Sequence, residues 1–560
     1  MRQKNLVKVG ALAMGAAMIG SVFSVPAFAA NSDGTPTKVT ETGAISIDAS
    51  SVEGTKVTGH KYNIYKVMDK YDAGSDGTNK IYQYKLTDAF KNFTSENFDI
   101  DVNTGKITTK QAITIGGTPY GAGILVDSSK SDTRNTNSAL VSVLASELAK
   151  YAYTNVSKAT VTSENGATAD GLEQGWYLVT ESETNTEDGL VATKPILLNL
   201  TDKGDVATMK DSRVTLEKVF TADGGTDLVK EDNFDIGDTI NYTITSVLPT
   251  YAANVDAASV KFTMTDTMSD GLTPPAASAV VVKIDGTAVT TVTPAINGQV
   301  LTIDVPADVV LANQGKSIVV EYPCVLNDKA LYNSTPDATN NNKVVLDFSN
   351  NPLVNKDSKQ LEDKTKVYTY AVDFQKIDGA HGDLLEGAKF TLKKGDATIT
   401  LVKTDAADVD EYRPAVGDET GITEFTTSGK EVRFIGMDDG TYTLTETEAP
   451  SGFSKLSGPL SFTITGTKGD EDKLTGAATV TSGSDALKLV KDDNTESDGV
   501  ITAKAENAAP EVNLQVKNYE GISLPSTGAM TSLIVTGAGA AIIGGGLFFG
   551  LRRKKDEDED

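Results

Sequence analysis

The sequence has 560 residues and is acidic, with 77 Asp and Glu residues against 51 Lys and Arg residues and a formal net charge of −26. An acidic surface is repelled by nucleic acid, so this charge excludes a nucleic-acid-binding protein and favours solubility. The two histidines, His60 and His381, lie far apart in sequence, and with Cys324 they show no spacing typical of a metal site or a nucleophile–base pair. We therefore expect no metal, no cofactor and no conventional turnover enzyme.

The first 30 residues are typical of a secretory signal peptide. Three basic residues, Arg2, Lys4 and Lys8, precede an apolar stretch rich in Ala, Gly, Met and Val. Ala27 and Ala29 are the small residues that precede a signal-peptidase cut. We therefore predict a secreted protein whose mature chain begins near residue 31.

Most of the mature chain shows the pattern of β-strands. Short runs rich in Val, Ile, Thr, Tyr and Phe alternate apolar and polar residues, and Gly, Asp and Asn interrupt them. This pattern predicts a mainly β protein of tandem immunoglobulin-like β-sandwiches. In the first segment, five apolar residues instead recur at helical spacing and predict a helix packed on a sheet: Leu140, Val143, Leu144, Leu148 and Tyr151.

The strand patterns restart after polar, charged segments near Ser212 and Lys364. We predict a signal peptide at 1–30, an N-terminal domain at 31–212, a middle domain at 213–363, a C-terminal domain at 364–522 and a C-terminal signal at 523–560. Cys324 is the only cysteine, so no disulfide within the chain can stabilise these domains.

In the middle domain, three predicted strands each carry one polar residue on an otherwise apolar face. Residues of equal parity point to the same side of a strand. The three sets are Val214, Leu216 and Lys218; Phe262, Met264 and Asp266; and Val344, Leu346, Phe348 and Asn350. Buried charges are rarely left unpaired, so we expect Lys218, Asp266 and Asn350 to meet. Asn351 is an alternative to Asn350 with the opposite parity.

The C-terminal domain repeats this arrangement with a glutamate as the acid. Its three sets are Val372, Phe374 and Lys376; Tyr442, Leu444 and Glu446; and Val512, Leu514, Val516 and Asn518. Burial lowers the pKa of a lysine and so makes its amine nucleophilic, while a neighbouring acid can polarise an amide and carry protons. The alternative is an ordinary buried ion pair of Lys376 and Glu446 with Asn518 as a hydrogen-bond partner, although such pairs gain little net stability.

Residues 440–453 read GTYTLTETEAPSGF and resemble the E-box (YxLxETxAPxGY) of collagen-adhesin B-type domains, with Phe453 in place of the usual Tyr. The resemblance implies that Lys376 attacks the Asn518 amide, with Glu446 as catalyst, releasing ammonia and leaving an isopeptide bond. Segments 234–244 and 348–352 are similar to the middle domain of sortase-assembled backbone pilins. That similarity implies the same bond between Lys218 and Asn350 with Asp266 as catalyst.

The N-terminal domain departs from this pattern. Its segment 175–181 retains an E-box-like strand ending in Glu181, but Ile45, Ile47 and Ala49 place an alanine where the nucleophilic lysine would stand. We therefore predict no isopeptide bond in this domain. Without such a bond it should be the most labile of the three.

A lysine between the first two domains is the predicted acceptor for joining subunits. Lys210 in segment 206–212 occupies the place of the pilin motif, whose lysine attacks the sortase acyl-enzyme of an incoming subunit. Lys203 and Lys194 are the alternatives. Any of them can instead be an ordinary solvated surface lysine.

The C-terminal tail contains a pentapeptide, an apolar run and a basic stop in that order. The pentapeptide is Leu524, Pro525, Ser526, Thr527 and Gly528. The run at 529–551 is long enough to cross a membrane, and the basic residues at 552–555 would remain cytoplasmic. This order resembles the LPxTG sorting signal that sortases cut between Thr and Gly; the alternative is a plain single-span anchor with a chance motif.

Taken over nearly the full chain, the features resemble those of a backbone fimbrial subunit of Gram-positive bacteria. The resemblance implies a structural protein that is anchored in the cell wall and contributes to adhesion. Its implied partners are identical subunits, a pilus-specific sortase, peptidoglycan through a housekeeping sortase, minor pilins and host or bacterial surface ligands. The alternatives are a monomeric wall-anchored adhesin and a minor pilin at the base or tip.

Overall fold

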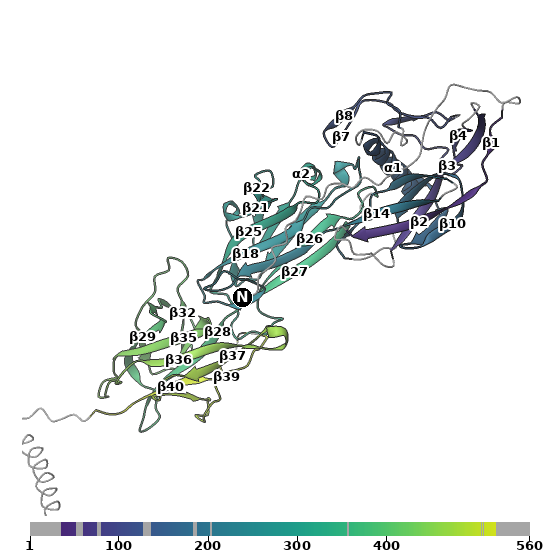
Figure 1. The fold of residues 1–560 in the computed structure, drawn as a ribbon. Helices are drawn as coiled ribbons and strands as arrows, with labels where there is room; N and C mark the ends of the chain where they lie inside the picture. The colour runs from purple at the N-terminus through teal and green to yellow at the C-terminus, as the bar shows by residue number, and fades with distance from the viewer. Residues whose placement is uncertain are drawn as a thin grey trace, which may run out of the picture. The chain divides into compact units, whose positions relative to one another are not determined.

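The computed structural model describes residues 35–51, 60–75, 80–102, 104–126, 136–182, 188–201, 204–354, 358–505, 507 and 509–521. They form two compact units, each seen in Figure 1. The first unit ends at Val367 but leaves out Asn233–Gly237 and Ala330–Thr339, which belong to the second unit with the residues from Tyr368 onward. The predicted signal peptide at 1–30 and the sorting signal at 523–560 lie outside the described residues.

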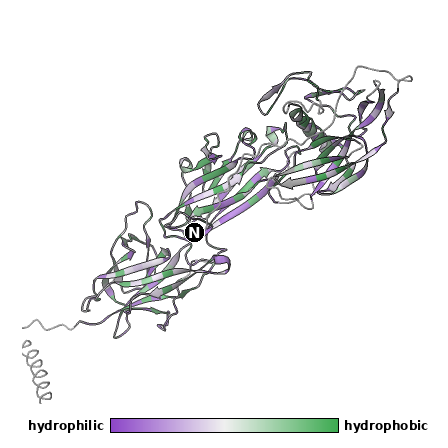
Figure 2. Ribbon diagram, in the orientation of Figure 1, coloured by the Kyte–Doolittle hydropathy of each residue, from purple (hydrophilic) through white to green (hydrophobic). Residues whose placement is uncertain are grey.

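Both units are built from strands along which apolar and polar residues alternate, as the sequence predicts. Figure 2 shows hydrophobic and hydrophilic residues succeeding each other along the strands. In β25 (Ser317–Leu326) every second side chain is buried along the whole strand. The hairpin of β21 (Val281–Ile284) and β22 (Thr287–Ala288) turns at Asp285 and Gly286, which both have positive φ, as a tight two-residue hairpin turn requires. The mainly β fold class is confirmed.

The N-terminal part of the first unit contains two facing sheets. One consists of β1 (Thr37–Lys38), β3 (Lys61–Ser75), β4 (Lys80–Leu86), β9 (Val161–Glu164), β11 (Gly175–Glu181) and β13 (Ile196–Leu200). The other consists of β2 (Thr42–Ser51), β10 (Thr168–Glu173), β12 (Leu190–Val191) and β14 (Asp205–Arg213). Two small two-stranded sheets pair β5 (Phe98–Ile100) with β6 (Ile107–Thr109) and β7 (Ile113–Ile115) with β8 (Thr118–Tyr120). A core of Ile, Leu, Val and Tyr side chains fills the space between the two sheets.

The predicted helix is α1 (Thr136–Asn155), labelled in Figure 1. It packs against β11 and β13. Leu140, Val143, Leu144 and Leu148 are buried, and the Tyr151 ring contacts Phe90 and Phe93. All seven residues of β11 are buried, because the helix covers one face of the sheet and the second sheet covers the other. The helix therefore forms core, as predicted.

The middle part of the first unit is a sandwich of two larger sheets. The first contains β15 (Leu216–Thr221), β16 (Leu228–Val229), β18 (Thr239–Val247), β20 (Leu272–Thr273), β21, β22 and β25. The second contains β17 (Glu231–Asn233), β19 (Phe262–Met268), β23 (Ala295–Asn297), β24 (Val300–Asp304), β26 (Asn340–Ser349) and β27 (Ser358–Tyr368). Short helices are η1 (Ala257–Ser259), η2 (Ala277–Ala279) and α2 (Ala307–Ala312).

The second unit is also a two-sheet sandwich. One sheet has the order β31 (Leu401–Lys403), β32 (Asp410–Pro414), β34 (Val432–Met437), β28 (Tyr370–Asp378), β40 (Asn513–Asn518) and β38 (Leu487–Val490). The other contains β29 (Glu386–Lys394), β30 (Ala397–Thr398), β33 (Phe425–Ser428), β35 (Gly440–Glu448), β36 (Leu460–Lys468), β37 (Leu474–Ser482) and β39 (Val500–Ile501), and η3 is Asp470–Asp472. The first and last strands, β28 and β40, are neighbours and run parallel.

Two details of the predicted boundaries differ in the structure. The boundary at 363/364 falls inside β27, which pairs with β26 as far as Val367. The predicted linker around Lys210 is part of β14, which pairs in parallel with β2. Among the described residues, no helix has the length and apolar character needed to cross a membrane.

Candidate functional site

In the second unit, Lys376 lies inside the sandwich on β28. Its side chain shares an inward face with Val372 and Phe374, and only 1% of the residue is exposed. The Nζ atom donates to the carbonyl oxygen of Val516 on the adjacent β40 at 3.3 Å. Burial lowers the pKa of Lys376 to about 8, although the charges of Glu446 and Asp378 oppose this shift. Its amine is therefore partly neutral near physiological pH.

Glu446 and Asn518 meet beside this lysine. Asn518 Nδ2 donates to Glu446 Oε1 at 2.9 Å, and the backbone N–H of Leu456 donates to Oε2 at 2.7 Å. Lys376 is level with Val516, so Asn518 is two residues along the same face of the neighbouring strand. The Asn518 Oδ1 atom is buried and has no hydrogen-bond partner within the described part of the chain. The structure therefore brings together all three residues that the sequence pointed to in this unit.

In the middle sandwich, Lys218 and Asp266 also meet. Lys218 on β15 and Asp266 on β19 belong to opposite sheets, and both are fully buried. Lys218 Nζ lies 2.6 Å from Asp266 Oδ1 and also 2.6 Å from the hydroxyl oxygen of Tyr322 on β25. Burial lowers the pKa of Lys218, and the Asp266 charge opposes this effect.

The asparagine in this cluster is Asn342, not the predicted Asn350. Asn342 Nδ2 donates to the Tyr322 hydroxyl at 3.0 Å, and Asn342 is fully buried on β26. Asp266 is level with Val344, so Asn350, which follows the last residue of β26, lies six residues away, or about 20 Å at the usual rise of a strand. The Asn350 backbone oxygen instead accepts a hydrogen bond from Ala192.

The error has a clear cause. Asn342 and Asn350 have the same parity, so alternation alone points both of them inward. The difference is their level along the strand, which depends on pairing with β19. Asn351, the stated alternative, is buried, but it follows Asn350 along the chain and is farther still from Asp266.

In the N-terminal part, Glu181 has partners other than a lysine. Its Oε2 atom accepts from the backbone N–H of Thr193 at 2.8 Å, and its Oε1 atom lies 3.3 Å from Nδ1 of the buried His60. Ile45 and Ile47 are buried on β2, the strand that also contains Ala49. The absence of an isopeptide bond in this domain stays a prediction.

Two of the three candidate acceptor lysines lie within the described residues. Lys210 lies in β14, where its backbone is level with Ser50 of β2. Lys194 is exposed and lies between β12 and β13. Lys203 lies outside the described residues.

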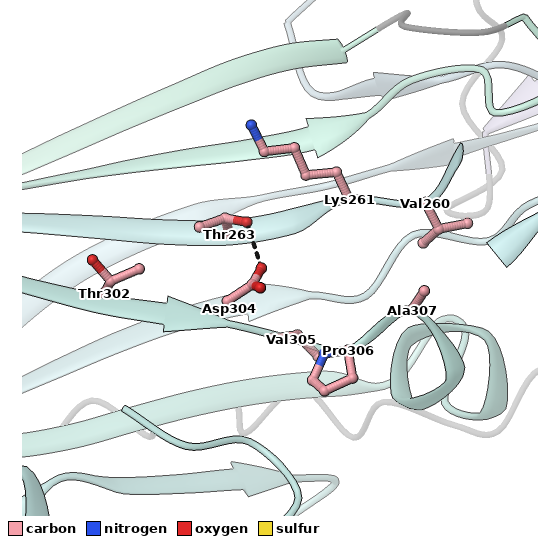
Figure 3. A pocket seen from close by; sticks show the side chains of 8 residues that line it. All are labelled: Val260, Lys261, Thr263, Thr302, Asp304, Val305, Pro306 and Ala307. Atoms are coloured by element: carbon pink, nitrogen blue, oxygen red, sulfur yellow. Dashed lines mark hydrogen bonds between the residues drawn. The ribbon is translucent and has the colours of Figure 1, made fainter. Parts of the chain in front are cut away.

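Figure 3 shows a shallow hollow on the middle sandwich, beside the start of α2. Thr263 donates to Asp304 at 2.7 Å within it, and Lys261 pairs with Asp347 at 2.6 Å. Its other lining residues are Val260, Thr302, Val305, Pro306 and Ala307. None of the residues proposed to form or catalyse a cross-link lines this hollow.

Two family models match the chain. Residues 371–479 match the SpaA prealbumin-like fold domain, and residues 517–558 match the LPXTG cell wall anchor motif. The C-terminal end of the chain therefore carries the motif of a cell-wall-anchored protein. The anchor match confirms the LPXTG motif that the sequence predicts at the C-terminal end of the chain. No curated protein sequence matches this chain.

Several solved structures are similar to this chain. The T6 backbone pilin of serotype M6 Streptococcus pyogenes has 17% identity and a TM-score of 0.49, and the alignment covers 86% of this chain and 99% of the pilin. The major pilin SpaD of Corynebacterium diphtheriae has 16% identity and a TM-score of 0.41, with 86% and 98% covered. The major pilin RrgB of Streptococcus pneumoniae has 14% identity and a TM-score of 0.40, with 86% and 100% covered.

Proposed function

We propose that this chain is the backbone subunit of a covalently polymerised cell-surface pilus. The observation that carries the proposal is the combination of an LPXTG anchor with two sandwiches that each enclose a lysine, an acid and an asparagine. Such a chain has one end suited to covalent transfer and an interior suited to covalent reinforcement. The sequence resemblance to sortase-assembled pilins supports the same conclusion.

Polymerisation joins the end of one subunit to a lysine of the next. A pilus-specific sortase breaks the peptide bond between Thr527 and Gly528 and holds the Thr527 carbonyl as a thioester. The amine of Lys210 on a neighbouring subunit then forms an amide with that carbonyl, which releases the sortase cysteine. Lys203 and Lys194 are the alternative acceptors. A housekeeping sortase attaches the finished fibre to peptidoglycan, and minor pilins or surface ligands complete the assembly.

Within each subunit, two lysines form amides with asparagines in a single turnover. In the second unit, the neutral amine of Lys376 attacks Cγ of Asn518, the new C–N bond replaces the old one, and ammonia leaves. Glu446, which holds the amide nitrogen, transfers the proton. In the middle sandwich, Lys218 and Asn342 react in the same way beside Asp266.

The choice of Asn342 over Asn350 gives a direct test. Asn342→Ala should abolish the middle cross-link, so the purified chain becomes heavier than wild type by about the mass of one ammonia after correction for the substitution. Asn350→Ala is the matched control and should retain the cross-link, because Asn350 lies far along the strand from Asp266. Intact-mass spectrometry and a tryptic map measure both. A cross-linked peptide containing residue 350 would contradict the assignment.

The second-unit bond should form faster as the pH rises. With a pKa of about 8, about one in ten Lys376 amines is neutral at pH 7 and most are neutral at pH 9. Freshly translated chain, extracted in denaturant and refolded at set pH, should lose ammonia at a rate that increases from pH 6 and levels off above pH 8 to 9. A rate that falls over this range would contradict a neutral lysine nucleophile.

An immunoblot of enzymatically released cell-wall material, boiled in SDS, tests the pilus proposal itself. A backbone subunit gives a ladder of high-mass species, because amide bonds survive boiling. A single band at the monomer mass would instead indicate a monomeric wall-anchored adhesin. A ladder built from another protein, with this chain as a minor component, would indicate a basal or tip pilin.

A further inference from the structure

We propose that Tyr322 is a catalytic residue of cross-link formation in the middle sandwich, where its hydroxyl carries a proton between Asp266 and the leaving nitrogen of Asn342. The inference rests on the proposed bond between Lys218 and Asn342. It adds a participant that the lysine, acid and asparagine pattern does not contain.

The Tyr322 hydroxyl is the one atom that contacts all three reacting groups in the described structure. It accepts from Lys218 Nζ at 2.6 Å and from Asn342 Nδ2 at 3.0 Å, and it donates to Asp266 Oδ2. Lys218 and Asn342 lie on different sheets, so this oxygen holds the amine and the amide side by side. The hydroxyl therefore lies directly between the acid and the nitrogen that must leave.

The second unit shows why such a bridge is needed. There, Glu446 reaches the Asn518 amide nitrogen directly at 2.9 Å. Asp266 has a side chain one methylene shorter, and its Oδ2 atom reaches Tyr322 rather than the asparagine. The tyrosine hydroxyl spans the distance that the longer glutamate covers by itself.

The surroundings keep this hydroxyl in place as a proton donor. Tyr322 is 2% exposed, and its ring stacks on Tyr242 with centroids 5.5 Å apart. Burial raises the pKa of Tyr322 well above its usual value, so the phenol holds its proton until one is supplied in exchange. Because Lys218, Asp266 and Asn342 are also fully buried, protein groups rather than bulk water must carry the proton.

The proton balance closes without any other reagent. In the reacting state Asp266 is protonated at Oδ2, so the Tyr322 hydroxyl accepts from Asp266 and turns its own proton toward the amide nitrogen. The neutral Lys218 amine then attacks Cγ of Asn342. As the new C–N bond forms, Asp266 Oδ1 takes a proton from the lysine nitrogen, Tyr322 gives its own proton to the departing amide nitrogen, and Asp266 Oδ2 returns one to Tyr322. The products are one amide and one ammonia, and both Tyr322 and Asp266 end as they began.

The test compares wild type, Tyr322→Phe and Tyr251→Phe in freshly translated full-length chain that is refolded from denaturant and followed by tryptic mass spectrometry. Tyr251 is a buried tyrosine of the same sandwich whose hydroxyl donates to the Ser349 backbone oxygen at 2.7 Å, so it controls for loss of a buried hydroxyl. The bond between Lys376 and Asn518 is an internal reference in each sample. Tyr322→Phe should slow the middle cross-link about 100-fold, the usual scale for loss of an acid–base group, and leave the reference bond at its normal rate.

A second replacement separates proton transfer from packing. Placing 3-fluorotyrosine at position 322 keeps the ring and its hydrogen bonds but makes the phenol more acidic, so the rate and its pH profile should shift, while the same replacement at position 251 should change neither. Equal rates in wild type and Tyr322→Phe would overturn the role of Tyr322. A wild-type chain that forms the second-unit bond but no bond at Lys218 would overturn the middle cross-link, and the inference with it.

Discussion

Lys376→Ala is expected to lower the unfolding temperature of the second unit by about 10–20 °C. The proposed bond joins β28 to β40 and closes a loop of more than 100 residues, and a cross-link over such a loop contributes about 5 kcal/mol to the free energy of unfolding. For a unit of this size each kcal/mol corresponds to about 2–4 °C. Differential scanning calorimetry measures the temperature, and intact mass reports the missing bond.

Three further variants make this test specific. Asn518→Ala removes the other partner and should give the same loss of stability, while Glu446→Gln retains both partners and should slow the reaction. Lys389→Ala is the matched control, because Lys389 pairs with Glu448 at 2.5 Å on the partly exposed surface, where an ion pair contributes little. Equal unfolding temperatures for wild type and Lys376→Ala would show that no stabilising bond exists.

Lys210→Ala is expected to collapse the high-mass ladder of released cell-wall material to the monomer band. The neighbouring subunit needs a neutral amine to attack the thioester, and alanine provides none. Lys210→Arg should also remove the ladder, because arginine retains the positive charge but stays protonated at any physiological pH. This second variant separates loss of the nucleophile from loss of charge.

Lys194→Ala and Lys203→Ala are the controls for this experiment. Each removes one lysine close in sequence and should leave the ladder intact. A ladder that persists in Lys210→Ala but disappears in one of these variants would move the acceptor to that lysine. The amount of monomer at the cell surface is measured in every strain, so a defect in export is distinguished from a defect in joining.

Side-chain alternation predicted which polar residues lie together where one inward polar residue occurred on each strand. Lys376, Glu446 and Asn518 each stood alone on an apolar face, and the structure brings them together. Asn340, Asn342 and Asn350 have the same parity along β26 and the residue that follows it, and only the pairing with β19 shows that Asn342 lies near the cluster. Parity gives the face of a strand but not the position along it.

Two other features could not be predicted from local sequence patterns. Lys210 was assigned to a linker, but its segment forms a parallel pair with β2, a strand about 160 residues earlier in the chain. Tyr322 is an inward residue of a regularly alternating strand, where a tyrosine has the pattern of ordinary core. Its contact with Asp266 depends on how the two sheets face each other, and its contact with Lys218 depends on the strand order β15, β18, β25 within one sheet.

The second unit includes Asn233–Gly237 and Ala330–Thr339, two segments that come before its own first strand. Lys394 pairs with Asp235 at 2.8 Å and with Asp438 at 2.5 Å, so an early segment supplies part of a later ionic contact. A chain is synthesised with its N-terminal end first, and domains generally fold in that order. Synthesis therefore delivers both segments before the rest of the unit. A fragment beginning at residue 364 would lack both segments, so its stability and folding would differ from those of the complete second unit.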